Sequence, residues 1–308
     1  MSAKPVVIWQ VYDDKPGHRN QLRGLSNALA EIAAVEVCEV PAPSKTSAIV
    51  GLFAKKFVHG AQLPRPDIIL GAGHSTHFGV LAARRTYGGK AVVLMKPSLP
   101  IGLFDLCIVP EHDVVPDSES VVRTRGVLNV VRPSMSQNER TGLMLIGGPS
   151  AAYGWSDERI VEQVSRVASG SPDVIWSLTT SRRTPSSFLK RLSERALQNL
   201  QAVCHEQTPP TWVPGQLVHA SQVWVSEDSV SMVYEALTSG AAVGLFDVPH
   251  ESYGRVAAGV DALVQTDWLS RFSQWSPGTR LRRPPERLDE ARRCAEIMLS
   301  RFSLIAAA

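Results

Sequence analysis

Two strand-to-helix junctions punctuated by glycine lie near the start of the chain, and a second pair follows in its C-terminal half. In the first junction the apolar run 6–11 ends in a polar turn, after which Gly17 and His18 open a stretch of helical periodicity. The apolar positions of that stretch are Leu22, Leu25, Ala28, Leu29 and Ile32. A buried strand that leads into an amphipathic helix is typical of a parallel α/β sheet.

The same alternation continues through residues 1–131, which we interpret as one Rossmann-like domain on the acceptor side. Strands are expected at 6–11, 35–40, 68–70, 91–95, 104–109 and 121–123, and helices at 20–34, 47–58 and 77–84. Because helices alternate with strands, both faces of the sheet should be covered.

The pattern restarts after the polar, proline-containing segment 132–141, which we interpret as a linker. Strands are then expected at 143–146, 174–178, 202–205, 222–225 and 242–245, helices at 157–168, 185–200 and 230–237, and a helical turn at 217–220. Residues 142–284 would form a second Rossmann-like domain, on the nucleotide side, facing the first across a central cleft. Residues 285–308 should form a C-terminal helix that packs on one domain or bridges both.

Bulk properties limit the classes of function. The 308 residues carry a net charge of only +3 without a concentrated basic patch, which gives no support for nucleic-acid binding. Four cysteines, Cys38, Cys107, Cys204 and Cys294, lie far apart without metal-ligand spacing, so we expect free thiols in a reducing cytoplasm. The early first strand leaves no room for a signal peptide, and no apolar run reaches the ~20 residues of a spanning helix.

Polar and basic residues follow three strand ends in the C-terminal half. They are Gly147, Gly148 and Ser150, then Thr180, Ser181, Arg182 and Arg183, and finally Glu227, Ser229, Ser231 and Glu235. Hydroxyls, arginines and helix N-termini suit phosphate oxygens, so this edge is predicted to bind a diphosphate. The alternative is structural: a tight glycine turn, solvated arginines, and Asp228 or Ser229 serving only as a helix cap.

In the N-terminal half, His18 follows the carboxylates of Asp13 and Asp14 and is the candidate general base. The alternative for His18 is a polar residue at a helix start. Further polar positions at strand ends would line the acceptor side, namely Asp14, Gly17, Gly73, His74, His77, Lys96 and Glu111. Although His74 and His77 have i, i+3 spacing, no third ligand is near in sequence, so no metal site is predicted.

The segment 44–60 allows two interpretations. Ile49, Leu52, Phe53 and Phe57 would share one face of a helix, beside Lys55 and Lys56. We favour packing of this face on the protein's own sheet. The competing hypothesis is a weak peripheral contact with an anionic membrane, because amphipathic helices flanked by basic residues bind such surfaces.

Several motifs together resemble the mitochondrial-fission "elongated mitochondria" family: DDKPGHRNQLRGLSNAL, GAGHSTHFGVLAARR, VVLMKPSLPIGLFDLCIVPEHD, LIGGPSAAYGW, TTSRRTP and SEDSVSMVYEAL. The resemblance covers roughly residues 6–249. That family is in turn similar to GT-B glycosyltransferases and UDP-sugar 2-epimerases. The glycine-rich turn that faces the acceptor in the lipid-linked N-acetylglucosamine transferase of peptidoglycan matches here only at Gly17 and His18.

The resemblance implies a nucleotide-sugar as ligand or substrate, with no cofactor. It implies glycosyl transfer without a metal, in which His18 takes the acceptor proton and Arg182 or Arg183 stabilises the leaving diphosphate. Glu235 would hold the donor ribose, with Glu227 as the alternative. Two other functions follow from the same resemblance: a non-catalytic adaptor with a protein partner, like the plant members that act in mitochondrial division, or a UDP-sugar 2-epimerase.

Overall fold

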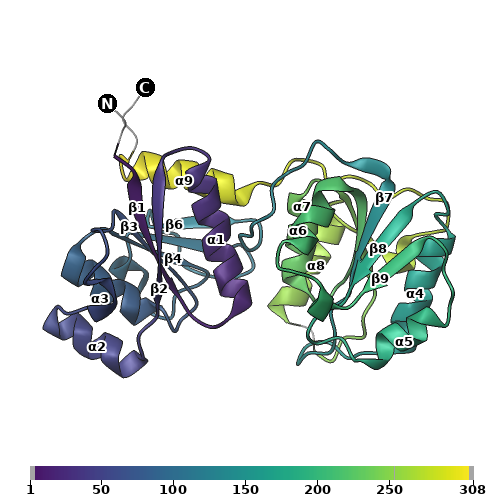
Figure 1. Cartoon of the computed structure of the whole chain (residues 1–308), viewed down its shortest axis with the longest axis horizontal. Helices are drawn as coiled ribbons and strands as arrows, with labels where there is room; N and C mark the ends of the chain where they lie inside the picture. Colours follow the sequence, from purple (N-terminus) through teal and green to yellow (C-terminus); the bar gives the residue numbers. More distant parts are fainter. Residues whose placement is uncertain (1–3, 253, 305–308) are drawn as a thin grey trace. The chain divides into compact units, whose positions relative to one another are not determined.

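The computed structural model describes residues 4–252 and 254–304, and the chain divides into two compact α/β units. The N-terminal unit comprises Met1–Val130 and Asp289–Ala308, and the C-terminal unit comprises Val131–Leu288. Each unit contains one six-stranded sheet in which the paired strands are parallel, with helices on both faces (Figure 1). The predicted fold class, two Rossmann-like α/β units, is therefore confirmed.

The N-terminal sheet has the strand order β2-β1-β3-β4-β5-β6. Its strands are β1 (Val6–Tyr12), β2 (Val35–Pro41), β3 (Ile68–Ala72), β4 (Lys90–Leu94), β5 (Leu106–Pro110) and β6 (Val121–Thr124), and its helices are α1 (Pro16–Ala30), α2 (Lys45–Ala54), α3 (His77–Tyr87) and α9 (Glu290–Arg301). Alternate side chains of β1 enter two separate cores. Ile8 packs with α1 and α9, whereas Trp9 packs on the face that α3 covers. Because successive side chains of a strand point to opposite faces of the sheet, alternate residues of β1 pack against different helical layers.

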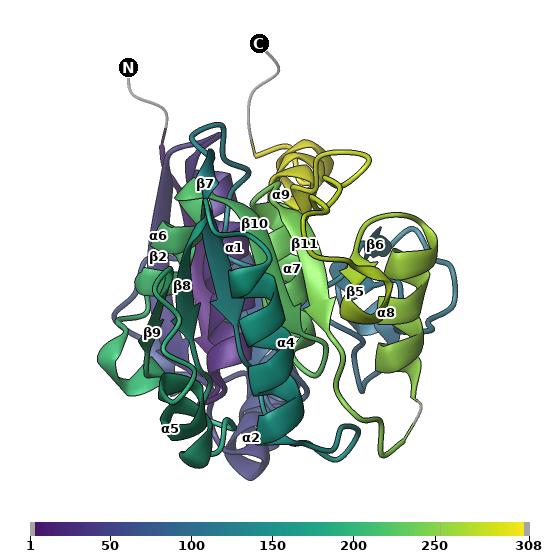
Figure 2. The ribbon, with the colours of Figure 1, turned by 90° about the vertical axis from the view of Figure 1, so that its right-hand side faces the viewer.

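The C-terminal sheet has the order β12-β11-β10-β7-β8-β9. Its strands are β7 (Asn138–Leu145), β8 (Ile175–Thr179), β9 (Leu200–Val203), β10 (Ala220–Ser226), β11 (Ala242–Phe246) and β12 (Ser270–Arg271), and its helices are α4 (Asp157–Ser169), α5 (Ser187–Ser193), α6 (Trp212–His219), α7 (Val230–Thr238) and α8 (Arg255–Gln265). Figure 1 shows α6 and α7 on one face of this sheet and α4 and α5 on the other, and Figure 2 looks onto the face that α4 covers.

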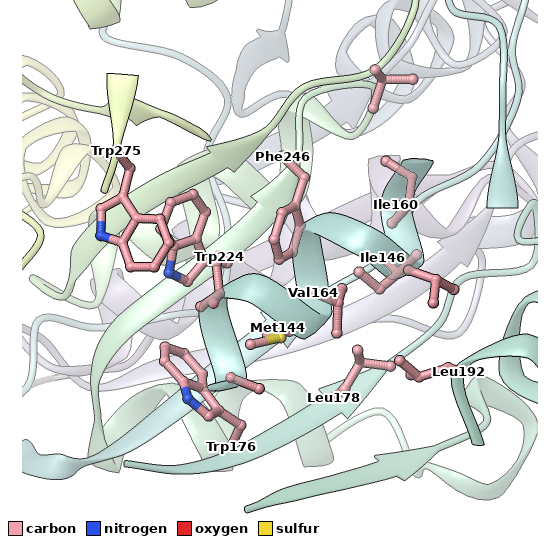
Figure 3. Close-up of a cluster of buried hydrophobic side chains, with 14 of the residues drawn as sticks. Met144, Ile146, Ile160, Val164, Trp176, Leu178, Leu192, Trp224, Phe246 and Trp275 are labelled. Atoms are coloured by element: carbon pink, nitrogen blue, oxygen red, sulfur yellow. The ribbon is translucent and has the colours of Figure 1, made fainter. Parts of the chain in front are cut away.

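Tryptophans fill the core between this sheet and α4 (Figure 3). Trp224 stacks on Phe246 with ring centroids 5.3 Å apart and meets Trp275 edge-on at 5.4 Å. Gly244 permits this arrangement, because a Cβ there would lie 2.5 Å from the Trp224 ring. Interlocking aromatic rings of this size make a large contribution to the burial of apolar surface.

Several predicted boundaries are wrong. The expected linker 132–141 overlaps β7, which begins at Asn138 and whose first three residues are exposed polar side chains. The expected helix 185–200 stops at Ser193, because Ala196 takes a left-handed φ of 47° before β9 begins. The expected helix 47–58 likewise stops at Ala54, since Lys55 has a φ of 52°. A helix cannot continue through a left-handed residue.

Other elements were not predicted or differ in length. Helix α8 and the short strand β12 had no prediction, and α6 spans eight residues where only a turn at 217–220 was expected. The C-terminal helix α9 begins one residue after its cap, Asp289, whose side chain accepts the Arg292 N–H. It packs on α1 within the N-terminal unit. Residues 305–308 of the predicted helix lie outside the described residues. None of the described helices is long and apolar enough to cross a lipid bilayer.

Candidate functional site

Each sheet has one point where the chain reverses the direction in which it adds strands. In the N-terminal unit this point lies between β1 and β3, and in the C-terminal unit between β7 and β10. At such a point the loops that follow the two strands diverge to opposite faces and leave room for a ligand at the carboxyl ends of the strands. These two places are therefore the candidate sites of the protein.

In the N-terminal unit, His18 and Asp13 form a hydrogen-bonded pair at the end of β1. Nδ1 of His18 lies 2.9 Å from each carboxylate oxygen of Asp13. Because an ionised carboxylate only accepts, Nδ1 carries the proton and Nε2 of the neutral ring keeps its lone pair. Ser75, in the loop after β3, donates to Asp13 Oδ2 at 2.6 Å and so joins the two loops of the switch point. A histidine held in this way can accept a proton at Nε2.

Gly73 is required beneath the His18 ring. Its φ is +84°, and a Cβ at this position would lie 2.2 Å from Cε1 of His18. Only glycine combines this backbone conformation with so close an approach. Burial by itself raises the pKa of Asp13, but hydrogen bonds from Ser75, His18 and the Lys15 amide outweigh it and leave this pKa below its usual value. Asp13 therefore stays ionised and holds the imidazole in place.

His77 lies in a different environment from His18. It is buried at the first residue of α3, with Nδ1 3.1 Å from Ser98 Oγ and Nε2 without a hydrogen-bond partner among the described residues. Burial, assisted by the nearby His74, lowers the pKa of His77 to about 4. His77 is therefore a neutral core residue. Within the described ranges, no group of three or more His, Cys, Asp or Glu is placed to hold a metal ion.

The remaining predicted residues of the N-terminal unit are exposed. Asp14 and Gly17 flank the start of α1, His74 lies in the loop after β3, and Lys96 and Glu111 follow β4 and β5. Of the acceptor-side set, the contacts around His18 include Gly73 only. The sequence did not single out Ser75, although its place in the turn between Gly73 and His77 was a signal for it.

In the C-terminal unit, the loops after β7 and β10 are bonded directly to each other. The Gly147 N–H donates to Ser226 Oγ at 2.6 Å, and the Gly148 N–H donates to Asp228 Oδ2 at 2.9 Å. A Cβ on Gly147 would lie 2.1 Å from Asp228 Oδ2. These glycines therefore allow the two loops to meet, and their N–H groups are already satisfied by protein oxygens rather than free for a phosphate.

Arg183 is also part of this internal network. It forms an ion pair of 2.6 Å with the fully buried carboxylate of Asp228, and Nη1 donates to the Gly148 carbonyl. Thr180 accepts the His205 N–H, and the Ser181 N–H is bonded to Thr184 Oγ1. Arg182, in contrast, is exposed at the end of β8.

Glu227 is buried in a charged cluster with Arg271 and Asp261, which the sequence did not reveal. Its Oε1 accepts the Val248 N–H at 3.0 Å, and its Oε2 accepts from Arg271 at 2.7 Å. Burial alone would lower the pKa of Arg271, but the bonds to Glu227 and Asp261 raise it above the ordinary value. Tyr153 lies buried beside this cluster, where desolvation and the charge of Glu227 raise its pKa to about 12.

The start of α7 is the part of this edge that can accept an anion. Its N-cap residue, Ser229, makes no side-chain capping bond, whereas Ser44, Ser156 and Asp289 cap their own helices. Ser231 is exposed on the first turn, and Glu235 is half-buried further along the helix. Ser150 Oγ accepts the N–H groups of residues 152 and 153 and so belongs to the loop after β7. The N–H groups of an uncapped first turn, together with the helix dipole, favour negative charge.

Solved structures with similar folds belong to the GT-B class. A putative UDP-N-acetylglucosamine 2-epimerase from Listeria monocytogenes matches with a TM-score of 0.62 at 11% identity, over 98% of both chains. A UDP-GlcNAc 2-epimerase from Neisseria meningitidis, solved bound to UDP-GlcNAc, matches with a TM-score of 0.53 at 11% identity, over 97% of this chain and 100% of the other. MurG from Acinetobacter baumannii matches with a TM-score of 0.50 at 12% identity, over 98% and 92%.

These likenesses confirm the GT-B-like fold, and at such low identity they speak for the fold alone. No curated protein sequence matches the chain. The family comparison is more specific, because it matches the family described as Mitochondrial fission ELM1 over residues 16–302. That span runs from the start of α1 to the end of α9 and covers most of the chain, so the chain belongs to the mitochondrial fission ELM1 family.

Proposed function

We propose that the C-terminal unit binds the diphosphate of a nucleotide-sugar at the N-terminus of α7. The observation that carries this proposal is that α7 starts at the switch point between β7 and β10 without a side-chain cap. Free N–H groups and the positive end of the dipole make such a helix start a ready anion site. The Neisseria meningitidis epimerase of similar fold, which was solved with UDP-GlcNAc, supports this class of ligand.

The donors that remain available define how the diphosphate would be held. Ser229 has a hydroxyl that its own helix does not use, and the guanidinium of Arg182 is exposed at the end of β8. Both can donate to phosphate oxygens, and arginine can do so through two parallel N–H groups. Arg183 instead neutralises Asp228, so that a negative ligand beside it does not meet an unpaired buried carboxylate.

Of the two glutamates considered for the donor ribose, we favour Glu235. Glu227 is 1% exposed, so a ribose hydroxyl could not reach its carboxylate. Glu235 is half-buried on α7, the helix whose start would hold the diphosphate. A nucleotide that binds at one end of this helix would present its ribose hydroxyls within the same unit.

The reaction that we propose is glycosyl transfer. The acceptor hydroxyl oxygen attacks the anomeric carbon, the bond from that carbon to the diphosphate oxygen breaks, and the hydroxyl proton passes to Nε2 of His18. Asp13 stabilises the imidazolium that forms. The N-terminus of α7 and Arg182 stabilise the leaving diphosphate in the role that a metal ion plays in other transferases. The nucleotide-sugar is then the substrate, and no further cofactor is needed.

Calorimetric titration with UDP, GDP and UDP-N-acetylglucosamine tests the donor site. Arg182→Ala and Ser229→Ala should each weaken binding by about 10- to 100-fold, since a hydrogen bond to a charged group contributes about 1.5–3 kcal/mol. Arg140→Ala is the matched control, because this arginine is exposed near the start of β7, at the opposite end of the strand from the proposed site. If no nucleotide binds at millimolar concentration, the donor site is refuted and the adaptor hypothesis is favoured.

His18→Asn tests the catalytic part separately. The variant should bind the nucleotide with unchanged affinity and turn over at least about 10²-fold more slowly, because it lacks the proton acceptor. Turnover at the wild-type rate would remove His18 from the mechanism while leaving the nucleotide site intact.

A further inference from the structure

The N-terminal unit carries an apolar groove that the proposed reaction does not use. Its volume is about 470 Å³, and it lies between α2, α3 and the short 3-10 helix η2 (Ile101–Leu103). Apolar side chains line most of it, namely Leu52, Phe53, Phe78, Leu81, Leu99 and Leu103. Arg84 and Arg85 complete its wall. The groove is therefore apolar inside, and Arg84 of its wall is paired with Asp105 at 3.3 Å.

Large apolar side chains around this groove are exposed. Phe53 and Val50 on α2 are 77% and 62% exposed, and Leu103 on η2 is 44% exposed. Val58, which opens the 3-10 helix η1 (Val58–Gly60), is 65% exposed. We call these four residues the apolar patch. Several exposed large apolar side chains on neighbouring elements mark an interaction site more often than an isolated surface residue does.

The patch is not the helical face that periodicity predicts. Phe57 is only 4% exposed and stacks on Trp9, with ring centroids 6.2 Å apart. It lies beyond the end of α2, because Lys55 takes a left-handed φ of 52° and redirects the chain. Packing on the sheet thus accounts for Phe57 but leaves Phe53 and Val50 outside.

Basic residues outnumber acidic residues around the patch. Residues 39–105 contain eight lysines and arginines and three acidic residues, Glu39, Asp67 and Asp105, and Asp105 pairs with Arg84 and Lys90. Asp67 accepts the Val7 N–H at the base of the sheet. Lys45, Lys55, Lys56 and Arg85 are exposed on α2, on α3 or just after α2. The positive charge therefore lies on the same elements as the apolar patch.

We propose that the apolar patch and these basic residues dock the N-terminal unit on the surface of an anionic lipid bilayer. Phe53 and Val50 enter the boundary between head groups and acyl chains, where a helix with one apolar face binds. The surrounding lysines and arginines meet the negative surface potential, which attracts each basic residue near it. A bilayer fits better than a single ligand, because the positive charge is spread along two helices rather than gathered in the groove. This proposal does not depend on nucleotide binding.

Co-sedimentation of the full chain with vesicles tests the proposal. Vesicles of phosphatidylcholine with 40% phosphatidylglycerol should pellet the protein at about 50 mM salt and release most of it at about 500 mM, where the Debye length falls to a few ångströms. Vesicles of phosphatidylcholine alone should pellet several-fold less. The variants Phe53→Ser and Lys55→Glu/Lys56→Glu should each lower the bound fraction several-fold.

Matched controls exist on the same chain. Met135→Ser removes a side chain that is 94% exposed in the C-terminal unit, and Lys190→Glu/Arg191→Glu reverses a basic pair on α5, so neither should change the bound fraction. The variant Phe53→Trp adds a direct reading, since its emission should shift to shorter wavelength on vesicle binding. Circular dichroism confirms that each variant is folded.

Three results would overturn the proposal. One is a protein that stays in the supernatant with anionic vesicles at low salt. Another is binding that Phe53→Ser and the lysine reversals leave unchanged. The third is a dimer in sedimentation velocity that Phe53→Ser dissociates while vesicles do not bind, which would assign the patch to a second copy of the chain.

Discussion

Arg183 and Asp228 join two loops that are 45 residues apart in the chain, with Nη2 of the arginine 2.6 Å from Oδ2 of a carboxylate that is completely buried. The same oxygen accepts the Gly148 N–H, so three loops of the C-terminal edge meet at one atom. A proposed ligand at the start of α7 would therefore lie against loops that are already fixed relative to one another, which reduces the entropy lost on binding.

Replacing Asp228 should destabilise the protein. In Asp228→Asn the charge that pairs with Arg183 is lost and the Gly148 N–H keeps a weaker acceptor, so we expect a loss of about 2 kcal/mol in the free energy of unfolding. Urea denaturation measures this change. The control Arg195→Ala breaks an exposed pair with Glu162 and should change stability by less than about 0.5 kcal/mol. Equal stability of the wild type and Asp228→Asn would contradict this account of the ion pair.

The Gly73→Ala variant should displace His18 from Asp13. Its Cβ would meet the imidazole at 2.2 Å, and a φ of +84° strains any L-residue, so a loss of about 1–3 kcal/mol is expected. The NMR chemical shifts of the two imidazole nitrogens of His18 report whether the proton stays on Nδ1, beside Asp13. Gly17→Ala is the matched control, since nothing lies within 4 Å of its Cβ, and it should leave these chemical shifts as they are. Unchanged chemical shifts in Gly73→Ala would show that the glycine is not needed.

Stability should depend on pH through His77. Burial lowers its pKa to about 4 from 6.5, so between these values the unfolded chain binds a proton that the folded protein does not. The free energy of unfolding from this group is therefore highest above pH 6.5 and falls as the pH drops towards 4, by about 3 kcal/mol in all. His77→Asn should flatten the curve between pH 7 and 4.5 in urea melts. Curves of equal slope in both proteins would exclude His77 as the cause.

The four free thiols should fall into two groups of different reactivity. Cys107 and Cys294 are fully buried, and burial raises the pKa of each to about 12, whereas Cys38 and Cys204 are half-buried. Because the thiolate is the reactive form, two thiols should react with a disulfide reagent in the native protein and two only after unfolding. Mass spectrometry of the labelled peptides identifies them. Native labelling of Cys107 would contradict its burial.

Elements with strong periodicity were predictable because their signal is local. The apolar face of α1 contains Leu22, Leu25 and Leu29, all fully buried, as the helical spacing required. Helix ends were less predictable. Lys55 and Ala196 adopt left-handed conformations that nothing in their residue type demands, and each cuts short a helix that the pattern had extended.

The sequence by itself determined that polar residues follow the strands of both units, since each side chain at a strand end can be read off the chain. Only the tertiary structure decided which of them meet. Ser75 reaches Asp13 across 62 residues because β3 pairs with β1, and Ser226 reaches Gly147 across 79 because β10 pairs with β7. Strand order is set by the packing of whole helices on sheets, a non-local property that no short motif contains. For the same reason Gly147 and Gly148, which were predicted to bind a phosphate, donate their N–H groups to Ser226 and Asp228 instead.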